Sequence, residues 1–247
     1  MKQISDRWLV QVQGHPSDLG GLEEHFSDAG FQIKKDADCY FYESDSFETC
    51  YTYNEVLEVA KTELAILTGA LRLEGLCREP LQAGSVSKIN ASGGKDIFVH
   101  VDEGLCVRAK CSANLMVTDS DGNLIPSEAK QVPRPVKLMA LASIEQLVAK
   151  ALRLKGSMDS KTWVGLYRIL EVVIEDVGSE NRFLSQGWGS KRDFKRFMRS
   201  ANSDTVAGDD ARHGRKDLSP PKEPMSIGEA QAYVNYVIES WLASKVI

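Results

Sequence analysis

The N-terminal part of the chain alternates between apolar and polar positions, which is the pattern of half-buried strands. Residues 8–12 (WLVQV) alternate in this way and predict a strand. His15 and Pro16 then open a short helix that we expect to extend to Phe26. A second strand is expected through residues 31–33, and the aromatic segment 39–42 (CYFY) either continues it or pairs with it.

A helical period replaces the alternation over residues 54–73. Apolar side chains recur there three and four positions apart, which predicts one amphipathic helix that covers the sheet. Asn54 is the expected N-cap, because its short polar side chain can accept a hydrogen bond from the first free backbone amides. Gly75 is the expected end of the helix, since glycine readily adopts the left-handed backbone found there.

Short apolar runs separated by turn residues follow this helix. We expect antiparallel strands over residues 97–101, 105–109 and 115–118, and then a hairpin turn at residues 119–122 (DSDG). The turn resembles the start of a calcium-binding loop but lacks the closing Glu, so we expect no metal site in it. The proline-rich stretch 126–135 predicts a domain boundary, because proline neither continues a helix nor donates to a sheet.

Beyond this boundary the hydrophobic pattern is helical. It predicts four amphipathic helices, over residues 136–154, 160–177, 191–202 and 226–245. The last of these should begin with a capping pair, Ser226 and Glu229, directly after Pro224.

The predicted fold class is therefore α+β with two domains. A small mixed α/β domain of undefined role is expected over residues 1–130, and a four-helix bundle over residues 136–247. Large aromatic side chains should fill the interior of the bundle, namely Trp163, Tyr167, Phe194, Phe197, Tyr233 and Trp241.

Composition adds an expected location in the cytoplasm. The chain has no run approaching the roughly 20 apolar residues of a membrane span, and its first residues lack the apolar core of a signal peptide. Its 5 cysteines, an odd number, predict reduced thiols rather than a disulfide framework. Cys106 and Cys111 should lie on opposite faces of a strand, which argues against a metal site there.

Charge is distributed unevenly along the chain. The net charge is −5, which by itself argues against a protein that coats nucleic acid. Residues 191–216 nevertheless carry a net +4, so the remainder of the chain carries −9. A basic island on an acidic protein is typical of a local polyanion-binding surface.

The predicted helix over residues 191–202 has two distinct faces. Phe194, Phe197, Met198 and Ala201 share the apolar face, which should pack in the bundle. The basic face is either merely solvated, as most charged helix faces are, or it binds RNA. The cations that would bind RNA are Lys191, Arg192, Lys195, Arg196 and Arg199, joined by Arg215 and Lys216 of the following loop.

That loop also contains residues suited to cleaving a phosphodiester. His213 can act as general acid or base, because histidine titrates near neutral pH. Arg212 and Asn202 are candidates to hold the phosphate beside it. The alternative is a structural role, in which Arg212 and His213 bind backbone carbonyls and tie the loop to the bundle.

Four segments of the helical half carry a resemblance to a known family: WVGLYRILEVV (163–173), GWGSKRDFKRFMRSANS (187–203), DDARHGR (209–215) and PMSIGEAQAYVNYVIESWL (224–242). Together they resemble an uncharacterised prokaryotic family related to the HEPN superfamily. The resemblance implies a helical bundle that forms a homodimer and acts on RNA, in phage defence or in a stress response. Active HEPN proteins place a His a few positions after an Arg and a polar residue, whereas here His213 lies 14 positions beyond Arg199.

Two functions are therefore predicted for the helical half. The first is a HEPN-like protein directed at RNA, either a metal-independent ribonuclease or an RNA-binding protein, which needs no cofactor. The alternative is a non-catalytic module that senses a ligand such as a nucleotide, or binds a protein, and dimerises through the bundle.

Overall fold

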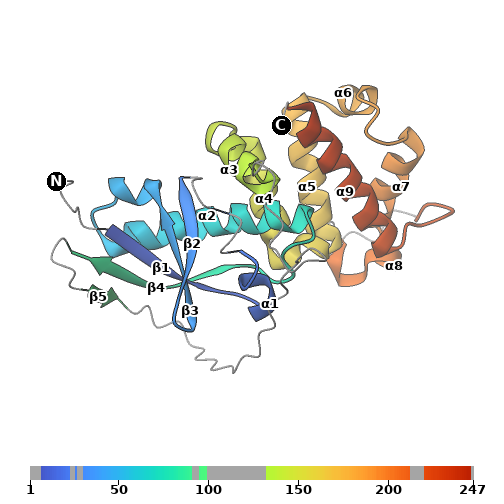
Figure 1. Ribbon diagram of the computed structural model, residues 1–247. Coiled ribbons are helices and arrows are strands. Elements are labelled where there is room, and N and C mark those ends of the chain that lie inside the picture. The colour runs from blue at the N-terminus through green and yellow to red at the C-terminus, as the bar shows by residue number, and fades with distance from the viewer. Residues whose placement is uncertain are drawn as a thin grey trace, which may run out of the picture. The chain divides into compact units, whose positions relative to one another are not determined.

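The computed structural model describes residues 7–22, 26, 30–90, 95–98, 132–211 and 220–245. The chain divides into two compact units (Figure 1). The first, here called the sheet unit, contains residues 1–61 and 81–136. The second, here called the helical unit, contains residues 62–80 and 137–247. The described residues thus form an α+β protein with one antiparallel sheet and a larger share of helix.

The described residues of the sheet unit form a five-stranded antiparallel sheet in the order β2-β3-β1-β4-β5. The central strand β1 pairs with β3, where Val10 faces Tyr42, and with β4, where Val10 faces Val86. All three of these side chains are buried. The strands are β1 (Arg7–Gln13), β2 (Phe31–Asp36), β3 (Cys39–Ser44), β4 (Gln82–Ile89) and β5 (Lys95–Phe98).

Several sequence predictions for this unit are confirmed. Residues 8–12 lie within β1, and residues 39–42 lie in β3, which pairs with β2 rather than continuing it. The predicted strand 97–101 overlaps β5 at Ile97 and Phe98, and residues 99–101 lie outside the described residues. The other predicted strands, and Cys106 and Cys111 with them, lie outside the described residues.

The extent of one predicted helix was wrong, and one strand was missed. The helix that begins after His15, α1 (Pro16–Leu19), stops well before Phe26, because the two glycines at 20 and 21 disfavour helix. Strand β4 was not predicted, since its sequence QAGSVSKI shows no clear apolar alternation. Pairing with β1 and β5 makes this segment a strand.

Helix α2 (Tyr53–Leu73) begins one residue before the predicted N-cap, so Asn54 lies inside its first turn. The cap is Thr52, whose Oγ1 accepts from the amide of Glu55 at 3.3 Å. The Glu55 carboxylate in turn accepts from the amide of Thr52 at 3.0 Å. The predicted end is confirmed, because Gly75 follows the helix with a φ of 71°.

The helical unit combines residues 62–73 of α2 with the C-terminal helices. These are α3 (Arg134–Ile144, of which the unit includes residues 137–144), α4 (Gln146–Gly156), α5 (Trp163–Val177), α6 (Glu180–Ser185), α7 (Lys191–Ala201), α8 (Asp204–Ala207) and α9 (Ile227–Ser244). Short 3-10 turns lie at Met158–Lys161 (η2) and Gly208–Asp210 (η3). None of the helices in the described part of the chain is long and apolar enough to cross a membrane.

The predicted helix over residues 136–154 is in fact two helices. Glu145 separates α3 from α4 with an extended backbone, and its carboxylate pairs with Lys245 at the end of α9. The predicted helix 160–177 begins later, at Trp163, because Thr162 caps it. The helices expected at 191–202 and 226–245 agree with α7 and α9 to within one residue at each end.

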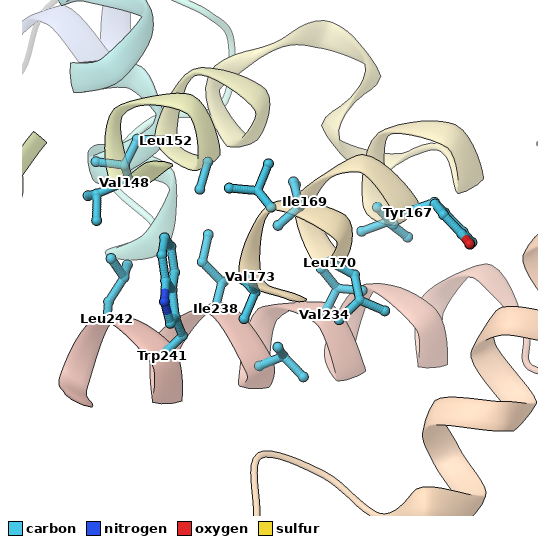
Figure 2. Close-up of a cluster of buried hydrophobic side chains, with 14 of the residues drawn as sticks. Val148, Leu152, Tyr167, Ile169, Leu170, Val173, Val234, Ile238, Trp241 and Leu242 are labelled. Carbon is cyan, nitrogen blue, oxygen red and sulfur yellow. The ribbon is translucent and has the colours of Figure 1, made fainter. Parts of the chain in front are cut away.

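Helix α5 forms the centre of the helical core. Its Leu170 and Val173 pack with Val148 and Leu152 of α4 and with Val234, Ile238, Trp241 and Leu242 of α9 (Figure 2). The predicted aromatic interior is confirmed for Trp163, Tyr167, Phe194, Phe197 and Trp241, which are all buried. Tyr233 is half-buried and packs against the same core.

Candidate nucleic-acid interface

Helix α7 positions the basic residues through its own buried face. Ser190 caps the helix, its Oγ accepting from the amide of Asp193 at 2.9 Å. The Phe197 ring, which is fully buried, lies 6.1 Å from Trp163 and 5.7 Å from Tyr233 between ring centroids. Because this face is locked into the aromatic core, the opposite face with its cations must point to solvent.

The outward face of α7 forms one wall of a groove with a volume of about 410 Å³, here called the basic groove. The other wall is the segment of residues 221–223, which precedes α9. Among the described residues that line the groove, five side chains are cations and one is a carboxylate. The lining residues are Arg192, Lys195, Arg196, Arg199, Pro221, Lys222 and Glu223.

Arg196 joins the two walls of the groove. Its Nε donates to the carbonyl of Glu223 at 2.7 Å, and its Nη2 donates to the carbonyl of Pro224 at 3.0 Å and to Oε1 of Glu229 at 2.9 Å. The side chain is only 23% exposed. Arg196 is therefore a structural clamp, and it has less capacity to bind a ligand than the sequence suggested.

Glu229 belongs to the capping box of α9 and is confirmed in that role. Its Oε2 accepts from the amide of Ser226 at 2.7 Å, while Ser226 Oγ accepts from the amide of Glu229 at 3.2 Å. The hydrogen bond from the Ser226 amide, and next the one from Arg196, hold the pKa of Glu229 below its usual value. The carboxylate is thus ionised where it meets Arg196.

The other cations of the basic groove are more open to solvent. Arg192 Nη2 lies 2.7 Å from Oε2 of Glu223, in a pair whose two side chains are 77% and 70% exposed. Arg199 donates to the carbonyl of Pro220 at 3.3 Å, and its side chain is exposed, as are those of Lys195 and Lys222. Such side chains can turn toward an anion at little cost.

Not every predicted RNA-binding residue lies at the basic groove. Lys191 is exposed on α7 but does not line it. Arg215 and Lys216 lie outside the described residues. Lys222 and Glu223 do line it and were missed, because the sequence PPKEP offers no local indication that it lies against a helix more than twenty positions earlier.

The predicted catalytic group is only partly described. Asn202 follows the last turn of α7, where its Nδ2 donates to the carbonyl of Met198 at 2.7 Å and its Oδ1 is buried. Ser200, which directly follows Arg199, is fully buried, and its Oγ accepts from the amide of Met225 at 2.9 Å. Arg212 and His213 lie outside the described residues.

Comparison with known proteins found no relative of this chain. No protein-family model matches the chain, and neither does any curated protein or solved structure. The likeness of the helical half to HEPN proteins therefore stays a prediction from the sequence. Within the described residues, no group of three or more His, Cys, Asp and Glu side chains is arranged to hold a metal ion.

Proposed function

We propose that the helical unit binds RNA through its phosphate backbone and that the basic groove is the contact surface. The observation that carries this proposal is the composition of the groove, whose described lining includes five cations and a single carboxylate. The chain as a whole has a net charge of −5, so this concentration of positive charge is local. A local basic surface on an acidic protein attracts a polyanion to one place.

The chemistry of the lining favours phosphate over base recognition. Arginine binds phosphate with two parallel hydrogen bonds, and lysine binds it as a mobile point charge. None of the described residues that line the basic groove is aromatic, so they offer no ring on which a base could stack. We therefore expect binding that depends little on RNA sequence.

Replacing both Lys195 and Arg199 by alanine should weaken RNA binding on the order of tenfold at low salt, since it removes two exposed charges from the groove. The slope of log K against log salt should flatten by about 0.7 for each phosphate of a single strand that the variant no longer binds. Fluorescence anisotropy with a labelled single-stranded RNA across a salt titration measures both quantities.

The matched control is Lys150→Ala with Arg153→Ala, which also removes one exposed Lys and one exposed Arg from a single helix, α4, away from the groove. This control should leave the slope unchanged. If the α7 variant behaved like the α4 variant, the basic face would be only solvated. The non-catalytic sensing or protein-interaction module would then be the better proposal.

The resemblance to HEPN proteins supports a second proposal for the helical unit. In this proposal the unit is a HEPN-like helical bundle that cleaves RNA. His213 would act as general acid or base, while Arg212 and Asn202 hold the scissile phosphate. RNA should then be cleaved in the presence of EDTA, and His213→Ala should slow cleavage by a factor of about 10² to 10⁴. His15→Ala, in the sheet unit, should cleave like the wild type. Undiminished cleavage by His213→Ala would remove that residue from the mechanism.

A further inference from the structure

The basic groove already contains an anion that belongs to the chain itself. Glu223 is the only carboxylate among the described residues that line it, and its Oε2 lies 2.7 Å from Nη2 of Arg192. A carboxylate and a phosphate both accept charge-assisted hydrogen bonds from a guanidinium. Glu223 therefore occupies the position on Arg192 that an RNA phosphate would take.

The backbone around Glu223 is anchored independently of its carboxylate. Arg196 binds the carbonyls of Glu223 and Pro224. Next in sequence, the Met225 side chain is buried and its amide donates to Ser200 Oγ at 2.9 Å. The Glu223 side chain itself is 70% exposed, so it can leave Arg192 while the segment stays in place.

We propose that the Glu223 carboxylate is a built-in competitor, which an RNA phosphate must displace from Arg192 before RNA occupies the whole groove. This inference rests on the proposed RNA binding. An exposed ion pair contributes little stability, so a polyanion that contacts several cations at once can displace the carboxylate. A single weak anion contacts fewer cations and so displaces the carboxylate less readily. Glu223 therefore makes the groove selective for polyanions.

Competition by Glu223 for Arg192 predicts a change in salt dependence that charge repulsion between Glu223 and RNA alone does not predict. Binding of a phosphate to a solvated cation releases a condensed counterion from the RNA and makes affinity depend on salt. In the wild type, Glu223 already acts as the counterion of Arg192. A contact between Arg192 and an RNA phosphate therefore adds little net neutralisation of charge. Removing the carboxylate should both tighten binding and steepen the dependence on salt.

The test is Glu223→Gln, measured with the full chain and a labelled single-stranded RNA by anisotropy across a salt titration. We expect binding about three- to fivefold tighter at low salt, the effect of one exposed ion pair. The slope of log K against log salt should steepen by up to about 0.7. Thermal unfolding should be unchanged, because the pair is exposed.

Two further variants separate local competition from a change of net charge. Glu175→Gln removes the carboxylate of another exposed pair, with Lys150 at 3.0 Å, and changes the net charge equally. It should not tighten binding measurably. In an Arg192→Ala background, Glu223→Gln should have no effect, because the guanidinium for which the carboxylate competes is absent.

Two results would overturn the proposed competition, provided that the wild type binds RNA in a salt-dependent manner. One is that Glu223→Gln binds RNA no tighter than Glu175→Gln does. The other is that Glu223→Gln tightens RNA binding by the same factor when Arg192 is replaced by alanine. RNA binding itself would then still stand. If neither the wild type nor any of these variants binds RNA in a salt-dependent manner, the proposed function fails and the competitor fails with it.

Discussion

Replacing Trp241 by alanine is expected to lower the free energy of unfolding of the helical unit by about 3 to 5 kcal/mol, the usual loss for a large buried aromatic side chain. Trp241 is 0% exposed and lies among side chains of α4, α5 and α9 (Figure 2). Its Nε1 also donates to Oδ2 of Asp176 at 2.8 Å. Alanine would leave a cavity at the junction of three helices. Urea denaturation followed by far-UV circular dichroism measures the loss.

The variant Trp241→Phe separates the cavity from the hydrogen bond. Phenylalanine keeps most of the apolar volume but cannot donate to Asp176. That carboxylate would still pair with Lys245, whose Nζ lies 3.0 Å away, so it would not be left without a partner. We expect a loss of about 1 to 2 kcal/mol. A loss below about 1 kcal/mol for Trp241→Ala would contradict the burial of this side chain.

Gly69→Ala is the second substitution with a large expected effect, a loss of about 3 kcal/mol or more in the stability of the helical unit. A Cβ at this position of α2 would lie only 2.0 Å from the carbonyl oxygen of Leu152 in α4. The facing residue of α4 is also a glycine, Gly156. A Cβ at Gly156 would lie 2.3 Å from the carbonyl oxygen of Ala65 in α2. The obstacle is backbone on both sides, so the two helices would have to move apart.

The matched control is Gly228→Ala near the start of α9, where an added Cβ meets no atom within 4 Å. Alanine is the better helix former by about 1 kcal/mol, so this change should be neutral or stabilising. Thermal denaturation of the two variants compares them directly. If Gly69→Ala were as stable as Gly228→Ala, the backbones of α2 and α4 could not approach each other this closely.

The α7 wall of the basic groove was partly predictable from the sequence, because helix periodicity is a local property. The spacing of Phe194, Phe197 and Ala201 was sufficient to predict which face of α7 is buried, and hence that the cations face solvent. The capping pair Ser226 and Glu229 was predictable for the same reason, since both partners lie within one turn. Neither inference needs a contact between distant parts of the chain.

The sequence by itself determined the faces of the helices, the strands with clear alternation, and the concentration of positive charge at α7. Only the tertiary structure decided that residues 62–73 of α2 belong to the helical unit and that β4 pairs beside β1. It also decided that the segment around Glu223 lies along α7, through hydrogen bonds between residues 27 to 31 positions apart. The physical reason is that periodicity and capping depend on neighbours within a turn, whereas these arrangements depend on which distant backbone groups and side chains meet on folding.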